Sequence, residues 1–241
     1  MTDRRRRAAA VVLVVHGTRL PSGVTAAHDL AARLTVRLGT PEPVRLAFAD
    51  LRPPNLTETL TSLPARRTVT VVPAFLASGF HVRSDVPEQL LRAARPVGAT
   101  TLTSPLGPDP SVVDALVARL AEAGARPGDA VVLAAAGSAR AAARAEVTGV
   151  AAELARRLGR GPIPVAWAAG PRGPSPEEAV AAARRGGARR VAVATWLLTP
   201  GLFADRLHRA GADLVAAPLG THPGVVDALA RRATEVPALV A

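Results

Sequence analysis

The chain repeats itself, and this internal repeat constrains the fold more than any other feature of the sequence. Residues 105–116 recur at residues 218–229, with nine identities at matched positions and an offset of 113. Earlier segments match more loosely at an offset of about 120, so the second copy carries a deletion after its third strand. The sequence therefore predicts two domains of one fold, at residues 1–126 and 127–241, joined by a turn at residues 124–129.

Within each copy, apolar runs alternate with helix-like stretches. The strands expected in the first copy are 11–15, 44–48, 69–75 and 100–103, and the expected helices are 25–38, 56–63, 86–94 and 111–123. The strand segments are continuously apolar, which indicates burial on both faces. Strand–helix alternation of this kind is typical of right-handed βαβ units. The predicted fold is therefore α/β, with two similar domains from an internal duplication. Each domain holds a small parallel sheet of about four strands flanked by helices.

Chemistry-bearing side chains follow three strands of the first copy. His16 comes after the first expected strand, Asp50 after the second and His81 after the third. Ligands of open α/β sheets bind beyond the carboxyl ends of the strands, so we expect these residues to converge. The second copy has alanine after its first two strands and no histidine after its third. The chemistry is therefore expected in the first copy, with the second copy as a scaffold.

Two imidazoles and a carboxylate can hold a divalent metal such as Fe, Co, Ni or Zn, and we expect His16, His81 and Asp50 to bind one. The two histidines can equally act as catalytic general bases at neutral pH. For Asp50, a helix or turn cap before two prolines is an alternative role.

Further residues of the first copy are expected to bind the ligand. Arg19, Arg52 and Arg83 lie on the same loops, and a guanidinium pairs bidentately with a carboxylate. Ser78 and Gly79 follow the third strand and complete the set of expected ligand-binding residues. In the second copy, His222 precedes a proline and is expected to cap a helix.

Composition narrows the classes of ligand. The formal net charge is +11 and arginine carries all the positive charge, so the chain attracts polyanions such as nucleic acid, anionic membranes or polycarboxylates. The absence of cysteine excludes disulfides, thiolate metal sites, iron–sulfur clusters and cysteine nucleophiles. Aromatic residues make up only 2%, which argues against an RNA surface that stacks bases. The glycine motifs of nucleotide sites are missing too, so we expect no nucleotide, no nucleic acid and no membrane partner.

The first 15 residues imitate a signal peptide, because four arginines at residues 4–7 precede an apolar run. The run is cut by His16 and lacks a small-residue cleavage site, so a buried first strand explains it better. The four arginines are then expected to form a solvated tail. Since no apolar run approaches the ~18–20 residues needed to cross a bilayer, we expect a soluble, cytoplasmic protein.

Three motifs of the first copy resemble the sirohydrochlorin chelatases, the class II chelatases of siroheme and cobalamin synthesis, in their long, internally duplicated form. The first is a strand followed by His-Gly-Thr-Arg at residues 16–19. The second is Phe-x-Asp followed by proline at residues 48–53, with Asp50 where the family usually has glutamate. The third is Val-x-Pro-x-Phe-Leu-x-x-Gly-x-His-x-x-x-Asp-Val-Pro at residues 71–87.

The resemblance implies ATP-independent insertion of a divalent metal into sirohydrochlorin, a tetrapyrrole with eight carboxylates. It assigns the handling of the metal to His16 and His81, whereas aspartate at position 50 reaches one methylene less far than glutamate. The macrocycle is expected between the two copies, with Phe48, Phe75 and Phe80 as apolar walls. We favour Fe²⁺ slightly over Co²⁺, with Ni²⁺ as a third metal, and expect a monomer that acts as a pseudo-dimer, or a weak oligomer.

Two other functions use the same residues. A non-catalytic carrier of metal or tetrapyrrole would need the same pocket, and only multiple turnovers distinguish it from an enzyme. A histidine phosphatase would need arginine directly before the first histidine, and that position holds Val15.

Overall fold

The computed structural model describes residues 9–170 and 172–235, so the arginine tail at residues 4–7 lies outside the described part. The strand–helix alternation expected from the sequence is confirmed in both copies. The first copy contains β1 (Ala10–Val15), α1 (Pro21–Leu38), β2 (Arg45–Phe48), α2 (Leu56–Thr61), β3 (Val69–Pro73), the π-helix η1 (His81–Asp85), α3 (Val86–Arg92), β4 (Thr100–Leu102) and α4 (Pro110–Glu122). The second contains β5 (Ala130–Ala135), α5 (Ala141–Arg157), β6 (Val165–Trp167), α6 (Pro176–Arg185), β7 (Val191–Trp196), α7 (Leu202–His208), β8 (Leu214–Val215) and α8 (Pro223–Thr234).

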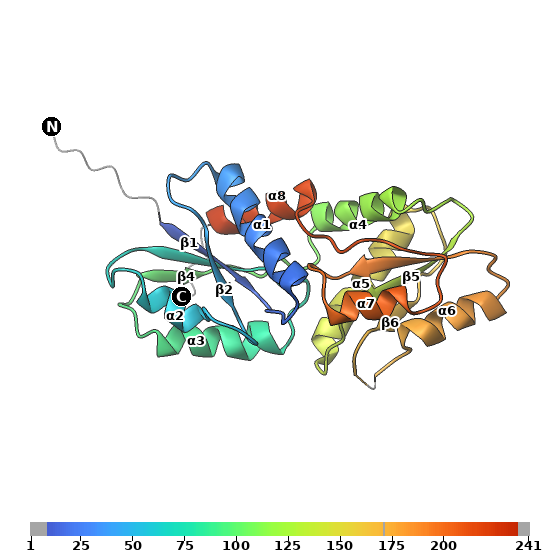
Figure 1. The fold of residues 1–241 in the computed structure, drawn as a ribbon, viewed down its shortest axis with the longest axis horizontal. Helices are drawn as coiled ribbons and strands as arrows, with labels where there is room; N and C mark the ends of the chain where they lie inside the picture. The colour runs from blue at the N-terminus through green and yellow to red at the C-terminus, as the bar shows by residue number, and fades with distance from the viewer. Residues whose placement is uncertain (1–8, 171, 236–241) are drawn as a thin grey trace.

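Each copy forms a parallel sheet of four strands with the same topology. The strand orders are β2-β1-β3-β4 and β6-β5-β7-β8, and the central pairs share one register, since Ala10 pairs with Val69 as Ala130 pairs with Val191. Helices cover both faces of each sheet (Figure 1). The predicted fold class is therefore confirmed, although the first helix begins at Pro21, four residues earlier than expected. Proline suits the first helical position because its fixed φ already fits the helix.

Successive residues of the central strands face opposite sides and enter different cores. Val11, Leu13 and Val15 of β1 join a central core that also holds alternate residues of β5 and the buried faces of α1, α4, α5 and α8. Val12 and Val14 face a separate core under α2 and α3. A third core lies between the second sheet and the helices α6 and α7. One apolar core is thus continuous through both copies.

The last helix of each copy packs against the other copy. α4 lies against β7 and α5, whereas α8 lies against α1 and β3 (Figure 1). α4 and α8 also contact each other, so they form the crossing between the two lobes. The boundary between two domains at residue 126 stays a prediction. The packing of α4 and α8 joins the two parts of the chain on either side of that boundary.

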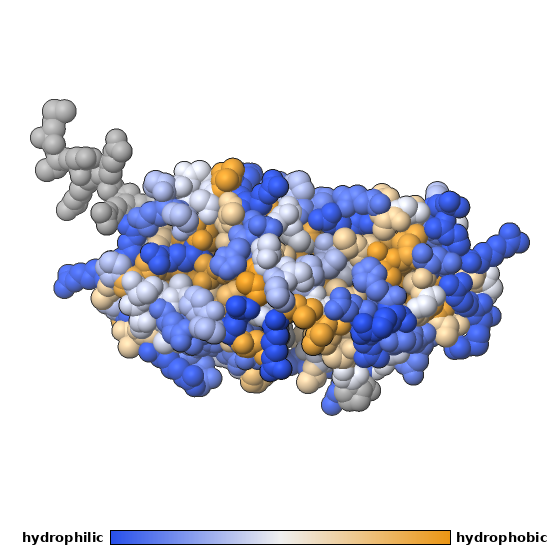
Figure 2. Space-filling model, in the orientation of Figure 1, coloured by the Kyte–Doolittle hydropathy of each residue, from blue (hydrophilic) through white to orange (hydrophobic). Residues whose placement is uncertain are grey.

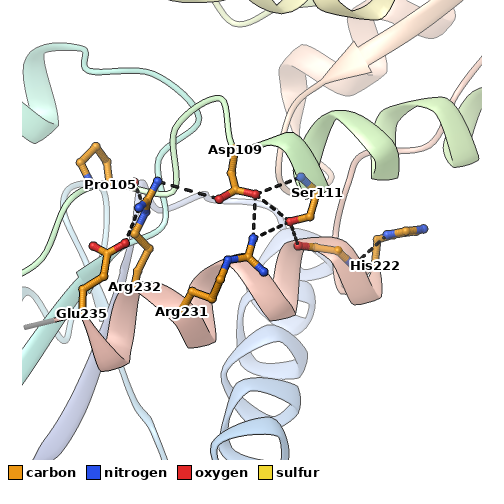
Figure 3. A network of polar contacts seen from close by, with 8 residues as sticks. Pro105, Asp109, Ser111, His222, Arg231, Arg232 and Glu235 are labelled. Atoms are coloured by element: carbon orange, nitrogen blue, oxygen red, sulfur yellow. Dashed lines mark hydrogen bonds and ion pairs between the residues drawn. The ribbon is translucent and has the colours of Figure 1, made fainter. Parts of the chain in front are cut away.

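A network of polar contacts fixes this crossing (Figure 3). Asp109 caps α4 by accepting a 2.9 Å hydrogen bond from the backbone N of Ser111, and also a 2.7 Å bond from Arg231 of α8. Oγ of Ser111 donates to the carbonyl oxygen of Gly224 at 2.8 Å. Burial raises the pKa of the Asp109 carboxyl, but hydrogen bonds from Ser111 and Arg231 outweigh burial and lower it overall. At the matching position His222 caps α8, as the sequence predicted.

Within the described ranges, none of the helices combines the length and the apolar character that crossing a bilayer requires.

Candidate active site

His16 stands at the carboxyl end of β1, where the backbone leaves little freedom. Gly17 follows with φ +104°, and a Cβ atom there would lie 2.1 Å from the carbonyl oxygen of Asp50. The backbone N of Asp50 donates a 3.0 Å hydrogen bond to the carbonyl oxygen of His16. Only glycine fits this close approach, which locks the loops after β1 and β2 together next to the His16 ring.

His81 stands in the loop after β3, at the start of the π-helix η1. Its Nδ1 bonds Oδ2 of Asp85, one turn along at the other end of η1. Both side chains are about a quarter exposed, at 25% for His81 and 22% for Asp85. Single π-turns of this kind recur at functional sites, and here the turn brings the carboxylate to the ring.

The structure brings the two predicted histidines together. Their ring centroids lie 4.3 Å apart with the planes at 81°. Nδ1 of His16 lies 3.1 Å from the carbonyl oxygen of Gly17, and a bond to that acceptor places the proton on Nδ1. The Asp85 carboxylate does the same for His81. In each neutral ring Nε2 therefore keeps its lone pair, which can bind a metal or accept a proton.

The surroundings favour the neutral form of His16. Although the residue has an exposed edge, desolvation of its ring by the surrounding protein is the largest cause that lowers its pKa, and nearby His81 lowers it further. The carbonyl of Gly17 and the carboxylates of Asp50 and Asp85 act in the opposite direction without outweighing these effects. A histidine with a lowered pKa has its lone pair available at neutral pH.

Asp50 behaves differently from the histidines. The residue is exposed, and its Oδ1 accepts a 2.7 Å hydrogen bond from the backbone N of Leu51, whose φ is +69°. Among the residues that the structure describes, no group of three or more His, Asp or Glu side chains is arranged to hold a metal. The local hydrogen bond agrees with a turn-capping role, and metal binding by Asp50 stays a prediction.

Of the three expected arginines, Arg52 is the most integrated into the site. Its guanidinium lies 5.3 Å from the centre of the Phe48 ring, and Nη1 donates to the carbonyl oxygen of Thr18 at 3.3 Å. Its Nε is buried and has no hydrogen-bond partner among the residues that the structure describes. Arg19 lies exposed on the loop after β1, and Arg83 lies exposed in the π-helix η1. An unpaired buried donor is rare in native proteins, and an acceptor on a bound ligand would satisfy it.

Comparison with known proteins identifies the family. The CbiX family model matches the chain twice, at residues 10–123 and at residues 130–236. The chain belongs to the CbiX family. The resemblance to the sirohydrochlorin chelatases found in the sequence is thereby confirmed, and each copy corresponds to one complete match.

Similar sequences come from archaea. The sirohydrochlorin cobaltochelatase of Methanopyrus kandleri is 29% identical over 138 residues, which cover 47% of this chain and 96% of the relative. The sirohydrochlorin cobaltochelatase of Methanothermobacter thermautotrophicus is 28% identical over 132 residues, covering 47% of this chain and 91% of the relative. This CbiX-family chain is thus about twice as long as the parts that match these relatives.

Similar solved structures extend over both copies. The sirohydrochlorin chelatase SirB from Bacillus subtilis subspecies spizizenii, in complex with cobalt, superposes with a TM-score of 0.75 at 20% identity and covers 93% of each chain. SirB from Bacillus subtilis with Fe³⁺ gives the same TM-score and coverage at 24% identity. At this identity the likeness shows a shared fold.

Two residues at the site of this CbiX-family chain received no role from the sequence. Asp85 stands in the third motif, and its spacing of four residues from His81 on a helix is the signal that predicts their contact. Glu146 of α5 accepts a 2.7 Å hydrogen bond from the backbone N of Ser78. No sequence spacing predicts that second contact, because it joins the two copies.

The apolar surface near the site differs from the one expected. Phe48 and Phe75 are buried in the cores, with exposed fractions of 2% and 8%, so they are not exposed walls for a ligand. Phe80 is 59% exposed, and Leu202 and Phe203 of α7 are also exposed. These residues follow β3 and β7, and Figure 2 shows apolar surface on both sides of the notch between the lobes.

Proposed function

We propose that this chain is a sirohydrochlorin chelatase, which inserts a divalent metal into sirohydrochlorin without ATP. The observation that carries the proposal is the His16–His81 pair, with ring centroids 4.3 Å apart and both Nδ1 atoms occupied by acceptors of the protein. The names of the archaeal relatives and the family match support the same reaction.

The two Nε2 atoms hold the incoming metal ion, which is a substrate of the reaction. Insertion replaces the two pyrrole N–H protons by M²⁺, so two protons must leave the ring as the metal–nitrogen bonds form. The lowered pKa of His16 keeps its ring neutral, so the ring can bind the metal first and accept one of the two protons once the metal has moved to the macrocycle. Nε2 of His81 accepts the other proton. Asp85 keeps the His81 ring in the tautomer that both steps require.

The substrate's carboxylates are bound by arginine. Arg52 offers the unpaired Nε close to the loop that carries His16. Arg19 adds positive charge on that loop, and Arg83 adds it from the π-helix η1. Ser78 and Gly79 lie on the loop that leads from β3 to His81. The formal net charge of +11 attracts a polycarboxylate to the chain.

Fe²⁺ and Co²⁺ both suit a pair of imidazoles, and Ni²⁺ has the same ligand preference, so the site alone does not choose among them. We keep the slight preference for Fe²⁺ as the hypothesis to be tested. The central core that both copies share supports a monomer whose two copies take the place of two subunits. The cytoplasmic location expected from the sequence stays a prediction.

The test is anaerobic absorbance spectroscopy of sirohydrochlorin with substoichiometric protein and Fe²⁺, Co²⁺ or Ni²⁺ in turn. The H16A/H81A variant should lose about 10²–10⁴-fold in rate, the range that loss of positioned acid–base groups produces. The matched control is H28A/H208A, which removes two exposed histidines on α1 and α7 and should keep the wild-type rate.

Binding of the tetrapyrrole without multiple turnovers for any metal would indicate a carrier instead. Absence of binding would contradict the proposal altogether.

A further inference from the structure

The loop that carries His81 is held by the second copy on one side of the histidine. The backbone N of Ser78 donates to Oε2 of Glu146 at 2.7 Å, and Glu146 is half-buried on α5. Hydrogen bonds to an ionised carboxylate are shorter and stronger than bonds between neutral groups. This contact is therefore a firm attachment of the loop to the other copy.

Arg140, which precedes α5, contacts the same segment on the other side of His81. Its Nη2 donates to Oγ of Ser84 at 3.2 Å, inside the π-helix that joins His81 to Asp85. Its guanidinium lies 6.0 Å from the centre of the Phe80 ring, and that ring lies 6.1 Å from the His81 ring. The second copy thus contacts residues on both sides of the histidine.

A comparison of the two copies shows that the carboxylate of Glu146 has no counterpart at the equivalent position of the first copy. The residues of α1 and α5 follow an identical pattern of burial over 21–30 and 141–150, which pairs Ala26 with Glu146. The first copy therefore has a methyl group where the second has a carboxylate.

The donor, the backbone N–H of Ser78, also has no counterpart in the second copy. A Cβ on Gly79 would lie 3.8 Å from Oγ of Ser138, and a Cβ on Gly201 would lie 3.8 Å from Oγ1 of Thr18, so the two glycines occupy matching places. The residue before Gly201 is Pro200, which has no backbone N–H. Acceptor and donor are thus both present beside His81 and both absent from the matching place.

His81 needs such support more than His16 does. His16 directly follows the buried strand β1 and is fixed by the close approach at Gly17. His81 stands eight residues beyond Pro73, the last residue matched in the β1–β3 register, and begins the π-turn that leads into α3. Loops move more than the strands they connect. A displacement of 1 Å in a reacting group can cost about 10²-fold in rate.

We propose that Glu146 and Arg140 position His81 against His16, so that the copy without the histidines sets the geometry of the pair. Glu146 acts through the loop and does not touch the substrate, which makes it a positioning residue. The effect on catalysis rests on the proposed function, whereas the attachment of the loop does not.

The experiment compares E146A, E146Q and E153A in the full chain. Hydrogen–deuterium exchange of peptides covering residues 76–85 reports the attachment, and steady-state metal insertion reports kcat and KM for sirohydrochlorin. E146A should speed exchange at residues 76–85 and lower kcat by about 10-fold or more, as loss of a supporting residue does, with KM changed by less than about threefold. E146Q keeps an oxygen that accepts from Ser78 and should restore protection and most of kcat.

E153A is the matched control, because Glu153 lies on the same helix and, within the described part of the chain, pairs with Arg156 and Arg157 of that helix. Wild-type exchange at residues 76–85 in E146A would overturn the attachment, and faster exchange with unchanged kcat would overturn the positioning role. If the wild-type protein inserts no metal, the proposed function fails and the exchange result alone decides whether Glu146 holds the loop. If E146A does not fold, the same two measurements are made on R140A, which removes the contact to Ser84 and changes an exposed residue.

Discussion

The loops after β1 and β5 have almost the same backbone but different side chains. Gly17 and Gly137 have φ values of +104° and +116°, and a Cβ at either would lie 2.1 or 2.2 Å from a carbonyl oxygen of the next loop. The residue before each glycine is His16 in one copy and Ala136 in the other. The backbone geometry that the fold requires is therefore kept in both copies, while the imidazole occurs only in the first.

The loops after β3 and β7 differ more. The first copy continues into the π-helix with His81 and Asp85, whereas the second begins an ordinary α-helix at Leu202, with exposed Leu202 and Phe203. The first copy thus adds titratable groups to its exposed Phe80, whereas the helix of the second copy begins with two exposed apolar residues. Under the proposed function this difference implies a division of work, in which the first copy handles the metal and the second holds the His81 loop.

Among the single substitutions, the largest expected effect comes from the group that fixes the His81 ring. D85A removes the acceptor of His81 Nδ1, so the ring can rotate and change tautomer, and we expect metal insertion to slow by about 10–100-fold. The matched control is D205A, since Asp205 is an exposed acidic residue of α7 in the second copy. Equal rates for D85A and wild type in the absorbance assay would contradict the role given to Asp85.

A second prediction uses the paired glycines. G17A and G137A each force a positive φ on alanine and a clash with a backbone carbonyl, so each should lower the free energy of unfolding by about 2 kcal/mol or more. Only G17A displaces a residue that directly follows His16, so only G17A should also lower the rate per folded molecule. Thermal unfolding and the insertion assay separate the two effects, and a similar loss of rate in G137A would argue against the difference between the copies.

The features that could be predicted from the sequence are those that depend on one copy alone. The continuous apolar runs predicted the strands, because residues 10–15 and 191–196 are buried on both faces. The convergence of His16 and His81 was predicted because parallel strands end at the same edge of a sheet. Both inferences use rules that act within one copy.

The features that the sequence did not reveal depend on contacts between the copies or on local turn geometry. α4 and α8 each pack against the other copy, and the Glu146–Ser78 hydrogen bond also joins the two copies. No periodicity within one copy encodes these contacts. The hydrogen bond from Leu51 to the Asp50 carboxylate depends on a positive φ at Leu51, which a leucine does not signal.

A third, smaller effect concerns pH. The pKa of His16 is lowered below its ordinary value of 6.5 mainly by burial and secondly by His81. In H81A the pKa of His16 should rise towards its ordinary value, because the lowering by His81 is removed. NMR titration of the imidazole signals measures this, with His222 as the comparison, since its pKa is lowered by burial and by Arg119 and should not respond to H81A.

The sign of the linked stability follows from these directions. The folded protein holds His16 and His222 in the neutral form more strongly than the unfolded chain does. Their contribution to stability is therefore fully present above pH 6.5 and is lost as the pH falls below 6.5 towards the folded-state pKa. A free energy of unfolding that rises on acidification through this window would contradict the direction of both shifts.

The smallest expected effects come from two side chains that donate hydrogen bonds to backbone carbonyls at equivalent positions of the two copies. Nε2 of Gln89 donates to the carbonyl oxygen of Ala49 at 2.8 Å, and Nη1 of Arg206 donates to that of Ala168 at 2.6 Å. Gln89 also accepts from the backbone N of buried Leu56 at 2.9 Å. Arg206 instead pairs with a surface carboxylate at the start of α6, Glu177, whose pKa its hydrogen bond lowers to about 2.

Q89A leaves the N–H of Leu56 buried without a partner, so it should cost about 1–2 kcal/mol in the free energy of unfolding. It also frees the loop that carries Asp50 and Arg52, and the insertion rate should fall a few-fold. R206A removes an exposed ion pair, which contributes little to stability, and its loop carries no predicted ligand-binding residue, so the rate should stay unchanged. Denaturant unfolding and the insertion assay measure both variants. A loss of rate in R206A equal to that in Q89A would mean that the loop after β6 also acts in the reaction, and the division between the two copies would not hold at this position.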